Sequence, residues 1–316
     1  MLLRKSMDEF SFIEYLKKKM PPSSQVSIGI GDDAAVLGIS KSKRLVVSTD
    51  MIVENVDFRI KTLRPEKIGR KVLAVNLSDI AAMGVSPTAF VISIGKPPYI
   101  TALWLKCFYK GLLSLARQYN IACVGGDFSR SQEFFASVTI FGEALPRQMV
   151  KRSGAKPGNW IAVTGALGGA LLKHHYDFMP RIREGLFLAK HIKPTAMIDI
   201  SDGLVQDLSH ILKASGVGAV LDLDKIPVSR DARKISRGNE KKALASALSG
   251  GEDFELLFTV SPEQKRRLEK IWMKEFPKVS LKWIGKIEGK VSRISWRRNG
   301  KKVALSKLAQ KGFSHF

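Results

Sequence analysis

The chain has 316 residues, of which 45% are hydrophobic and 26% charged, so it holds enough apolar material for one large or two smaller cores. Its 52 Lys and Arg against 29 Asp and Glu give a formal net charge of +23, which invites a nucleic-acid-binding interpretation. No apolar stretch reaches the roughly 18 residues of a membrane-spanning helix, the charged N-terminus lacks a signal-peptide core, and two cysteines are too few for a disulfide scaffold. We therefore expect a cytoplasmic protein without a membrane partner.

The first half of the chain alternates between helix and strand signals. Pro65 begins a helix that should end at Met83, because Gly84 follows directly and Pro87 lies just beyond. Periodicity predicts two further helices, at residues 10–20 and 101–119. Apolar runs predict four strands, at residues 44–50, 88–95, 121–127 and 134–144. The third of these strands contains Gly125 and Gly126 and is expected to carry a glycine turn.

A basic stretch rich in Gly and Pro, residues 147–160, is predicted to link two domains. Beyond it the pattern predicts strands at residues 160–165, 196–201, 218–224 and 254–260, and helices at residues 203–214, 243–250 and 262–276. We therefore expect a mixed α/β (α+β) chain with domains at residues 1–146 and 147–316.

The positive charge is concentrated near the C-terminus. Residues 261–316 contain 16 basic and 4 acidic residues, a net of +12, without a zinc-finger, ribonucleoprotein or basic-zipper pattern. A solvated basic face explains this excess, and a polyanion-binding surface is the alternative. If that alternative holds, affinity for nucleic acid should fall steeply with salt.

The acidic residues, by contrast, recur among Gly, Ser and Thr after apolar runs. The motifs are GIGDDAAV, VVSTD, NLSDIAAMG, VGGDFSR, IDISDGL and SGGEDFEL. We expect their carboxylates to face a cleft, where they would raise one another's pKa unless cations neutralised them. Carboxylate and hydroxyl oxygens suit hard cations, and Mg²⁺ together with phosphates fits best. For any single motif, ordinary turn or helix-cap chemistry remains open, as at Asp202-Gly203.

Other devices for binding phosphate or activating a nucleophile are absent from the sequence. It contains no Walker loop, no dinucleotide-binding glycine motif, no HExxH pair and no GxSxG elbow. The adjacent His174 and His175 are expected to form a solvated loop pair.

Eight motifs in order resemble those of the thiamine-monophosphate kinases, in the aminoimidazole ribonucleotide synthetase-like ATP-binding superfamily. They are GIGDDAAV, STDMIVE, NLSDIAAMG, VGGD, KRSGAKPG, IDISDGL, SGGEDFEL and the final GFSHF. The resemblance implies a two-domain fold of that superfamily, with an N-terminal mixed sheet and a C-terminal α/β sandwich that closes over the nucleotide. It also implies ATP-dependent phosphorylation of thiamine monophosphate to thiamine diphosphate, several Mg²⁺ ions and a homodimer paired through the N-terminal sheet.

The same resemblance assigns roles by motif. The positions that match Mg²⁺ ligands are Asp33, Ser48, Thr49, Asp50, Asp79, Asp127, Asp199 and Asp202. Those that match contacts to ATP are Tyr109, Gly126, Asp127, Arg152 and Ser201. Those on the side of the thiamine substrate are Asp57, Glu252 and Phe313.

Some positions depart from the family pattern. Asp57 replaces a substrate-side His, Phe128 replaces a Thr after GGD, and Phe313 replaces a Trp or Tyr. These departures leave the Mg-ATP residues intact and concern the acceptor side. An enzyme of the same superfamily with another acceptor therefore remains an alternative, as does a basic nucleic-acid-binding protein.

The implied reaction is consistent with elementary chemistry. A phosphate monoester is largely dianionic at neutral pH, since its second pKa is about 6, and needs no general base to act as a nucleophile. The difficulty is to bring two polyanions into line, which cations held by carboxylates would ease. The sequence accordingly predicts metal-assisted direct transfer without a catalytic His or Lys base.

Overall fold

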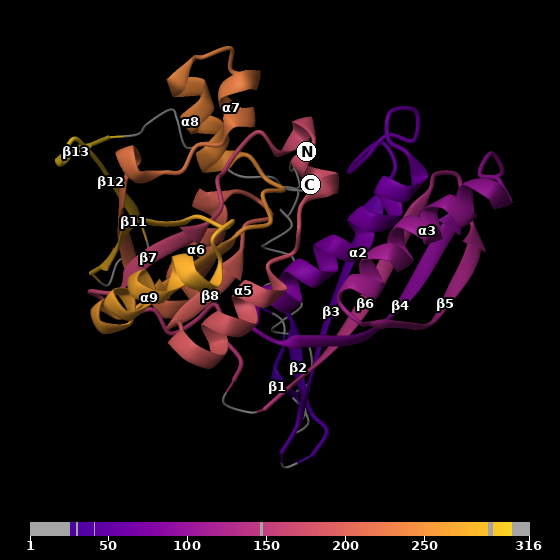
Figure 1. The fold of residues 1–316 in the computed structure, drawn as a ribbon, viewed down its shortest axis with the longest axis horizontal. Coiled ribbons are helices and arrows are strands. Elements are labelled where there is room, and N and C mark those ends of the chain that lie inside the picture. Colours follow the sequence, from indigo (N-terminus) through magenta and orange to yellow (C-terminus); the bar gives the residue numbers. More distant parts are fainter. Residues whose placement is uncertain (1–25, 30, 41, 146–147, 290–292, 305–316) are drawn as a thin grey trace, which may run out of the picture.

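The computed structural model describes residues 26–29, 31–40, 42–145, 148–289 and 293–304, and the helix predicted at residues 10–20 lies outside them. Two sheets dominate the molecule (Figure 1). The N-terminal sheet has the strand order β1-β2-β3-β6-β4-β5, and β4–β5 is its parallel pair. Its strands are β1 (Val26–Ile28), β2 (Ala35–Gly38), β3 (Arg44–Val53), β4 (Ser86–Lys96), β5 (Ala122–Arg130) and β6 (Phe135–Ala144).

Two helices, α2 (Pro65–Ala82) and α3 (Ala102–Gln118), cover one face of this sheet. Pro65 occupies the first turn of α2, and Thr101 caps α3 by accepting a hydrogen bond from the backbone N–H of Trp104. The two helices approach closely at Gly69. A Cβ at this position would lie 2.0 Å from the carbonyl oxygen of Phe108, so only glycine fits there. The bounds predicted for these helices, residues 65–83 and 101–119, are confirmed to within one residue at each end.

Two predicted strands extend further than the sequence suggested. β3 continues through Asp50 to Val53, so that carboxylate projects from the middle of a strand and not from its end. β5 continues through Gly125 and Gly126 to Arg130, with a register shift against β4 at Val124, and the expected glycine turn is wrong. A Cβ on Gly126 would lie 2.1 Å from the carbonyl oxygen of Ile92, so glycine permits close strand contact there.

The C-terminal sheet has the strand order β13-β12-β9-β11-β7-β10-β8 and is antiparallel except for the β9–β12 pair. Its strands are β7 (Trp160–Thr164), β8 (Ala196–Asp199), β9 (Gly218–Asp222), β10 (Leu256–Val260), β11 (Leu281–Glu288), β12 (Ile294–Arg298) and β13 (Lys301–Val303). The accompanying helices are η1 (Ala170–Leu172), α4 (His174–Asp177), α5 (Ile182–Phe187), η2 (Leu188–Ile192), α6 (Leu204–Ser215), η3 (Leu223–Lys225), α7 (Arg230–Ile235), α8 (Glu240–Ser249) and α9 (Pro262–Glu275).

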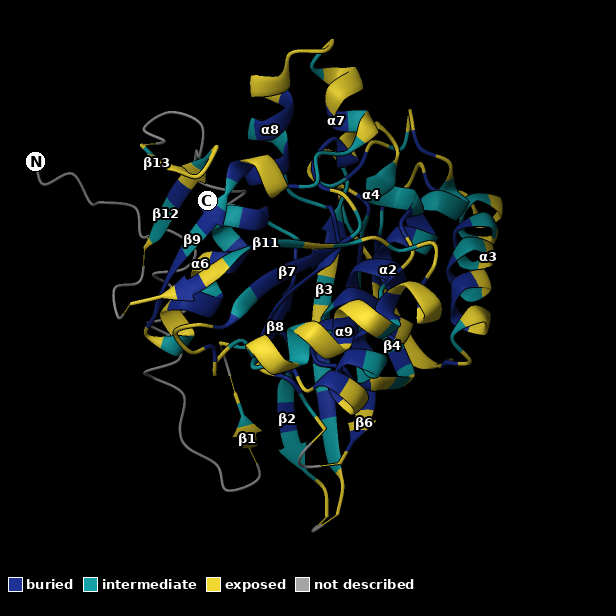
Figure 2. Ribbon diagram, turned by 60° about the vertical axis from the view of Figure 1, so that its left-hand side comes forward, coloured by how far each residue is buried: buried dark blue, intermediate teal, exposed yellow. Residues whose placement is uncertain are grey.

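Two hydrophobic clusters cover the two faces of the C-terminal sheet. One contains Leu208 of α6 and Leu248 of α8, and the other contains Leu268 and Trp272 of α9. The second cluster continues without a break into the core beneath α2. In the view of Figure 2, α2 is mostly buried, whereas α9 shows an exposed face to solvent.

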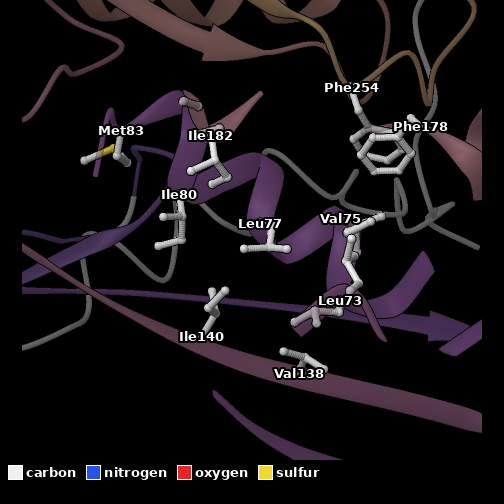
Figure 3. Close-up of a cluster of buried hydrophobic side chains, with 14 of the residues drawn as sticks. Leu73, Val75, Leu77, Ile80, Met83, Val138, Ile140, Phe178, Ile182 and Phe254 are labelled. Atoms are coloured by element: carbon white, nitrogen blue, oxygen red, sulfur yellow. The ribbon is translucent and has the colours of Figure 1, made fainter. Parts of the chain in front are cut away.

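Helix α2 joins the two halves. Leu77 and Ile80 face Val138 and Ile140 of β6, while Ile182 of α5 packs on another side (Figure 3). The expected mixed fold, with an N-terminal mixed sheet and a C-terminal sandwich, is confirmed. No helix in the described part of the chain is both long and apolar enough to cross a membrane.

Candidate functional site

A cavity of about 700 Å³ opens beside the C-terminal part of β3 and is lined by both halves of the molecule. The N-terminal half contributes β3 and α2, and the C-terminal half contributes the loops that follow β7, β8 and α8. Eleven of the residues singled out from the sequence line it: Asp33, Ser48, Thr49, Asp50, Asp57, Asp79, Arg152, Asp199, Ser201, Asp202 and Glu252.

Three carboxylates from distant parts of the chain meet at one end of this cavity. Ligand oxygens of Asp33, Asp79 and Asp199 lie within 4.8 Å of one another. Serine hydroxyls hold two of them: Ser48 Oγ donates to Asp79, and Ser78 Oγ donates to Asp199 Oδ2 at 2.6 Å. The cluster therefore exists because the loop between β1 and β2, helix α2 and strand β8 converge there.

Burial and mutual repulsion make this cluster electrostatically costly when it is ionised. Burial, then the charge of Asp50, raises the pKa of Asp79 well above its usual range. Burial, then the charge of Asp33, raises the pKa of Asp199 to about 8. Asp50 completes the group from β3, where its backbone N–H donates to Asn76 Oδ1 of α2 at 3.0 Å.

The donor set fits a hard divalent cation. Asp33 Oδ2 is buried and has no hydrogen-bond partner among the described residues, which leaves an acceptor aimed into an acidic cluster. Carboxylate and hydroxyl oxygens without nearby thiolates are the ligands that Mg²⁺ prefers. Asp33, Ser48, Asp50, Asp79 and Asp199 would hold such an ion.

The raised pKa of Asp199 predicts a pH dependence of stability in the absence of divalent cations. A carboxyl group that binds its proton more tightly in the folded state stabilises the fold at low pH and loses that contribution as pH rises. Wild type should therefore lose stability relative to Asp199→Asn between pH about 4 and about 8, by at most about 1.4 kcal/mol per pH unit. Urea unfolding in a chelator at several pH values measures this difference. A difference that is flat across this range would contradict the prediction, and added Mg²⁺ should reduce it.

A second group lies at the N-terminus of α6. Asp207 Oδ2 accepts hydrogen bonds from the backbone N–H groups of Asp202 and Gly203, at 3.1 and 3.0 Å. Ligand atoms of Asp202, Asp207 and His210 lie within 4.8 Å of one another. Burial, then Arg152, lowers the pKa of His210 to about 4, so its imidazole is neutral near pH 7. The sequence argument missed Asp207, although an acid in the first turn of a helix was a signal for it.

Arg152 binds the first group and lies close enough to the second for its charge to affect the pKa of His210. Its Nη2 donates to Asp33 Oδ1 at 2.8 Å, and its backbone N–H donates to Asp32 Oδ1 at 3.1 Å. Its Nε is buried and has no hydrogen-bond partner among the described residues. A guanidinium with a spare buried donor at the cavity wall is suited to bind a phosphate oxygen.

The other end of the cavity contains Asp57, Glu252 and a lysine that the sequence argument missed. The Asp57 carboxylate accepts the backbone N–H of Val53 at 2.7 Å and so stabilises a turn. Lys71, on α2, is buried and donates to Glu252. Its neighbour Arg70 is also positively charged, so the sequence does not reveal which of the two side chains is buried.

His174 and His175 are not the solvated loop pair that we expected. They begin the short helix α4, which packs against α2, and the side chain of His175 is 13% exposed.

Three predicted residues lie away from the cavity within one chain. Tyr109 is on α3 and contacts Phe128, while Gly126 and Asp127 are on the exposed edge strand β5. Asp127 is the end of a cross-strand row that begins at Met51 of β3 and passes through β6 and β4. Three strand spacings place it about 14 Å from β3. Phe313 lies outside the described residues.

Family models match most of the chain. The model described as AIR synthase related protein, N-terminal domain, matches residues 31–144, and the corresponding C-terminal domain model matches residues 156–292. The chain is 37% identical over 319 residues to the thiamine-monophosphate kinase of Rhodopirellula baltica, covering 97% of each chain. It is 36% identical over 329 residues to that of Escherichia coli K12, covering 98% of each.

The chain is also similar to solved structures over nearly its whole length. The chain superposes on a structure described as AaThiL complexed with AMPPCP and TMP with a TM-score of 0.83 and 30% identity, covering 100% of this chain and 99% of the other. For the thiamine-monophosphate kinase of Stenotrophomonas maltophilia the TM-score is 0.73 at 33% identity, covering 93% and 98%.

Proposed function

The chain belongs to the AIR synthase related proteins and, among them, to the thiamine-monophosphate kinase family, and we propose that it transfers the γ-phosphoryl group of ATP directly to the phosphate of thiamine monophosphate. The product would be thiamine diphosphate. The observation that carries this proposal is the cavity itself, which has a cluster of buried carboxylates suited to cations, an arginine suited to a phosphate, and a further end lined by Glu252 and Phe254. The relatives named for this activity match over nearly their whole length.

The residues at the acidic end would position the phosphates. Mg²⁺ ions bound there would screen the charge of ATP and of the acceptor phosphate and stabilise the charge that develops during transfer. Asp33, Ser48, Asp50, Asp79 and Asp199 supply oxygen ligands, and we extend this set to Thr49 and Asp202, which also line the cavity. Arg152 and Ser201 face the same space and would bind phosphate oxygens.

No residue needs to remove a proton from the acceptor, because a phosphate monoester is already largely dianionic at neutral pH. The contribution of the chain is therefore to align the two phosphates and to exclude competing water. The buried carboxylates would be held ionised by the cations, against the raised pKa values that Asp79 and Asp199 have without them.

The acceptor's organic part would extend toward the other end of the cavity. Glu252 lines this end and would contact the thiamine moiety, and Phe254 adds an apolar wall. Asp57 lies here too, and its carboxylate, held by the backbone N–H of Val53, would contact the substrate from this wall. A stacking contact from Phe313 remains a prediction.

We further propose that the enzyme is a homodimer in which β5 of each subunit completes the partner's site. All nine residues of β5 are exposed, and edge strands with free backbone groups favour pairing with another chain. Asp127 lies too far from Asp50 in its own chain to share a cation with it. Thr49 and Met51 line the cavity from the sheet face that carries Asp127, so the partner's Asp127 would reach the cavity across that face, with the adjacent Gly126 and with Tyr109 from the other face of β5.

Three expectations from the sequence remain predictions. They are a domain boundary between residues 146 and 147, a cytoplasmic location, and a solvated basic face in the C-terminal part that does not bind nucleic acid.

The first experiment is product formation from ATP, Mg²⁺ and thiamine monophosphate, with thiamine as a parallel acceptor. We expect thiamine diphosphate from the monophosphate and no phosphorylation of thiamine, because only the monophosphate presents an ionised phosphate nucleophile. Chromatographic separation of the thiamine species measures both reactions. Binding of ATP without any thiamine diphosphate would contradict the proposed acceptor and favour another member of the superfamily.

A further inference from the structure

We propose that Lys71 is a positioning residue that orients the Glu252 carboxylate at the acceptor end of the cavity and so governs affinity for thiamine monophosphate. This inference rests on the proposed function and concerns a residue to which neither the motifs nor the fold assigned a role. Lys71 lines the cavity from α2, and its side chain is only 1% exposed.

The burial of Lys71 is the first observation. Lysine is almost never fully buried unless it is paired, since desolvation of an ammonium group is costly. On the same helix, the side chain of Lys67 pairs with Asp177 while it remains 39% exposed. Lys71 therefore occupies a site built to receive a charge.

The partners of Lys71 are complete. Its Nζ donates to the Glu252 carboxylate, to the backbone carbonyl oxygen of Asp57 at 2.9 Å, and to His175 Nδ1 at 3.2 Å. An ammonium group has three N–H donors and no acceptor, so these three partners satisfy it fully. Its own donors are therefore not free for substrate, and it acts through Glu252.

His175 is a neutral acceptor in this arrangement. Burial, then the charge of Lys71, lowers the pKa of His175 to about 4. The imidazole therefore accepts at Nδ1 and carries its proton on Nε2 near pH 7. The charge of Lys71 remains available to Glu252, whose Oε2 lies 3.6 Å from the same Nδ1.

Glu252 is held from two sides. Its backbone has φ of +64°, in the left-handed region that residues with side chains seldom adopt, and its N–H donates to the carbonyl oxygen of Ser201 at 2.7 Å. The side chain is fixed by Lys71. A strained backbone and an ion pair with a buried lysine together restrict the orientation of this carboxylate at the cavity wall.

Helix α2 relates this anchor to the acidic cluster. Lys71 and Asp79 are eight residues apart on one uninterrupted helix, which corresponds to about 12 Å along its axis. The helix thus sets the separation between the cation-binding end and the Glu252 end of the cavity. Lys71 and Asp57 belong to the N-terminal half and His175 and Glu252 to the C-terminal half, so the pair also joins the two halves at the acceptor end.

The test is Lys71→Met, which keeps most of the side-chain volume and removes the charge. We expect the KM for thiamine monophosphate to rise at least about 10-fold, while the KM for ATP changes by less than about 2-fold. The matched control is Lys67→Met, which removes the Lys67–Asp177 pair between α2 and α4 and should leave both KM values unchanged. Thermal unfolding of each variant reports any loss of stability separately.

The double variant Lys71→Met with Glu252→Gln makes the test independent of folding, because no unpaired buried carboxylate remains. If Lys71 acts through Glu252, the double variant should match Glu252→Gln alone within about 2-fold in KM. A further loss of about 10-fold would instead indicate a direct substrate contact by Lys71 and overturn the proposal, as would a lowered melting temperature with unchanged KM. Activity of wild type toward thiamine monophosphate, measured in parallel, separates a failure of this inference from a failure of the proposed function.

Discussion

Asp79→Asn is expected to lower kcat for thiamine diphosphate formation by at least about 10³-fold while the metal-free protein stays folded and at least as stable as wild type. A carboxylate oxygen of Asp79 lies within 4.8 Å of those of Asp33 and Asp199, and Asp79 also accepts a hydrogen bond from the hydroxyl of Ser48, so it belongs to the proposed cation site. Asn keeps the shape and can still accept that hydrogen bond, but it removes the negative charge. Without cations, Asn removes the cost of burying an ionisable carboxyl group beside other carboxylates, a cost that the raised pKa of Asp79 reflects.

Two measurements check this expectation together. Product formation gives kcat, and thermal unfolding with and without Mg²⁺ gives the stabilisation that the cation confers on the folded state. Wild type should gain stability with Mg²⁺, and Asp79→Asn should gain much less. Asp222→Asn is the control, because Asp222 pairs with Lys225 away from the cavity. Wild-type turnover by Asp79→Asn would remove the metal role from this cluster.

Two inactive variants should restore activity when they are co-expressed. Asp50→Asn and Asp127→Asn are each expected to be inactive as homodimers, since each removes one carboxylate from every site. If Asp127 acts in the partner's site, the mixed dimer has one site without either substitution. Random assembly of equal amounts should then give about a quarter of the wild-type activity.

The measurement is thiamine diphosphate formation by the co-expressed pair, with each variant alone as the baseline. Differently tagged subunits allow the mixed dimer to be purified, and its activity should approach half that of wild type. Recovery of no activity in a purified mixed dimer would place Asp127 in the site of its own chain. A chain that remains monomeric would contradict the proposed assembly directly.

The sequence by itself determined most of the local structure and most of the acidic site. Pro65 and Gly84 bound α2 because proline suits a first helical turn and because Gly84 has φ of +65°. Thr101 begins α3 for a similar local reason. The motifs around Asp33, Asp79 and Asp199 were also visible, since carboxylates among small residues in an acid-poor chain are unusual without a ligand.

Only the tertiary structure decided which of these residues meet. Asp50 and Asp127 have similar motifs, but the strand order β3-β6-β4-β5 places two strands between them, and strand order depends on long-range pairing that local sequence does not encode. Lys71 and Arg70 are adjacent and alike, and only the packing of α2 against α4 and the loop at Glu252 buries one of them. Local steric and hydrogen-bonding preferences act over a few residues. The burial of Lys71, in contrast, depends on His175 and Glu252, which are more than 100 residues away in the sequence. Burial of this kind also shifts pKa values, so the electrostatics of the site depend on the tertiary structure.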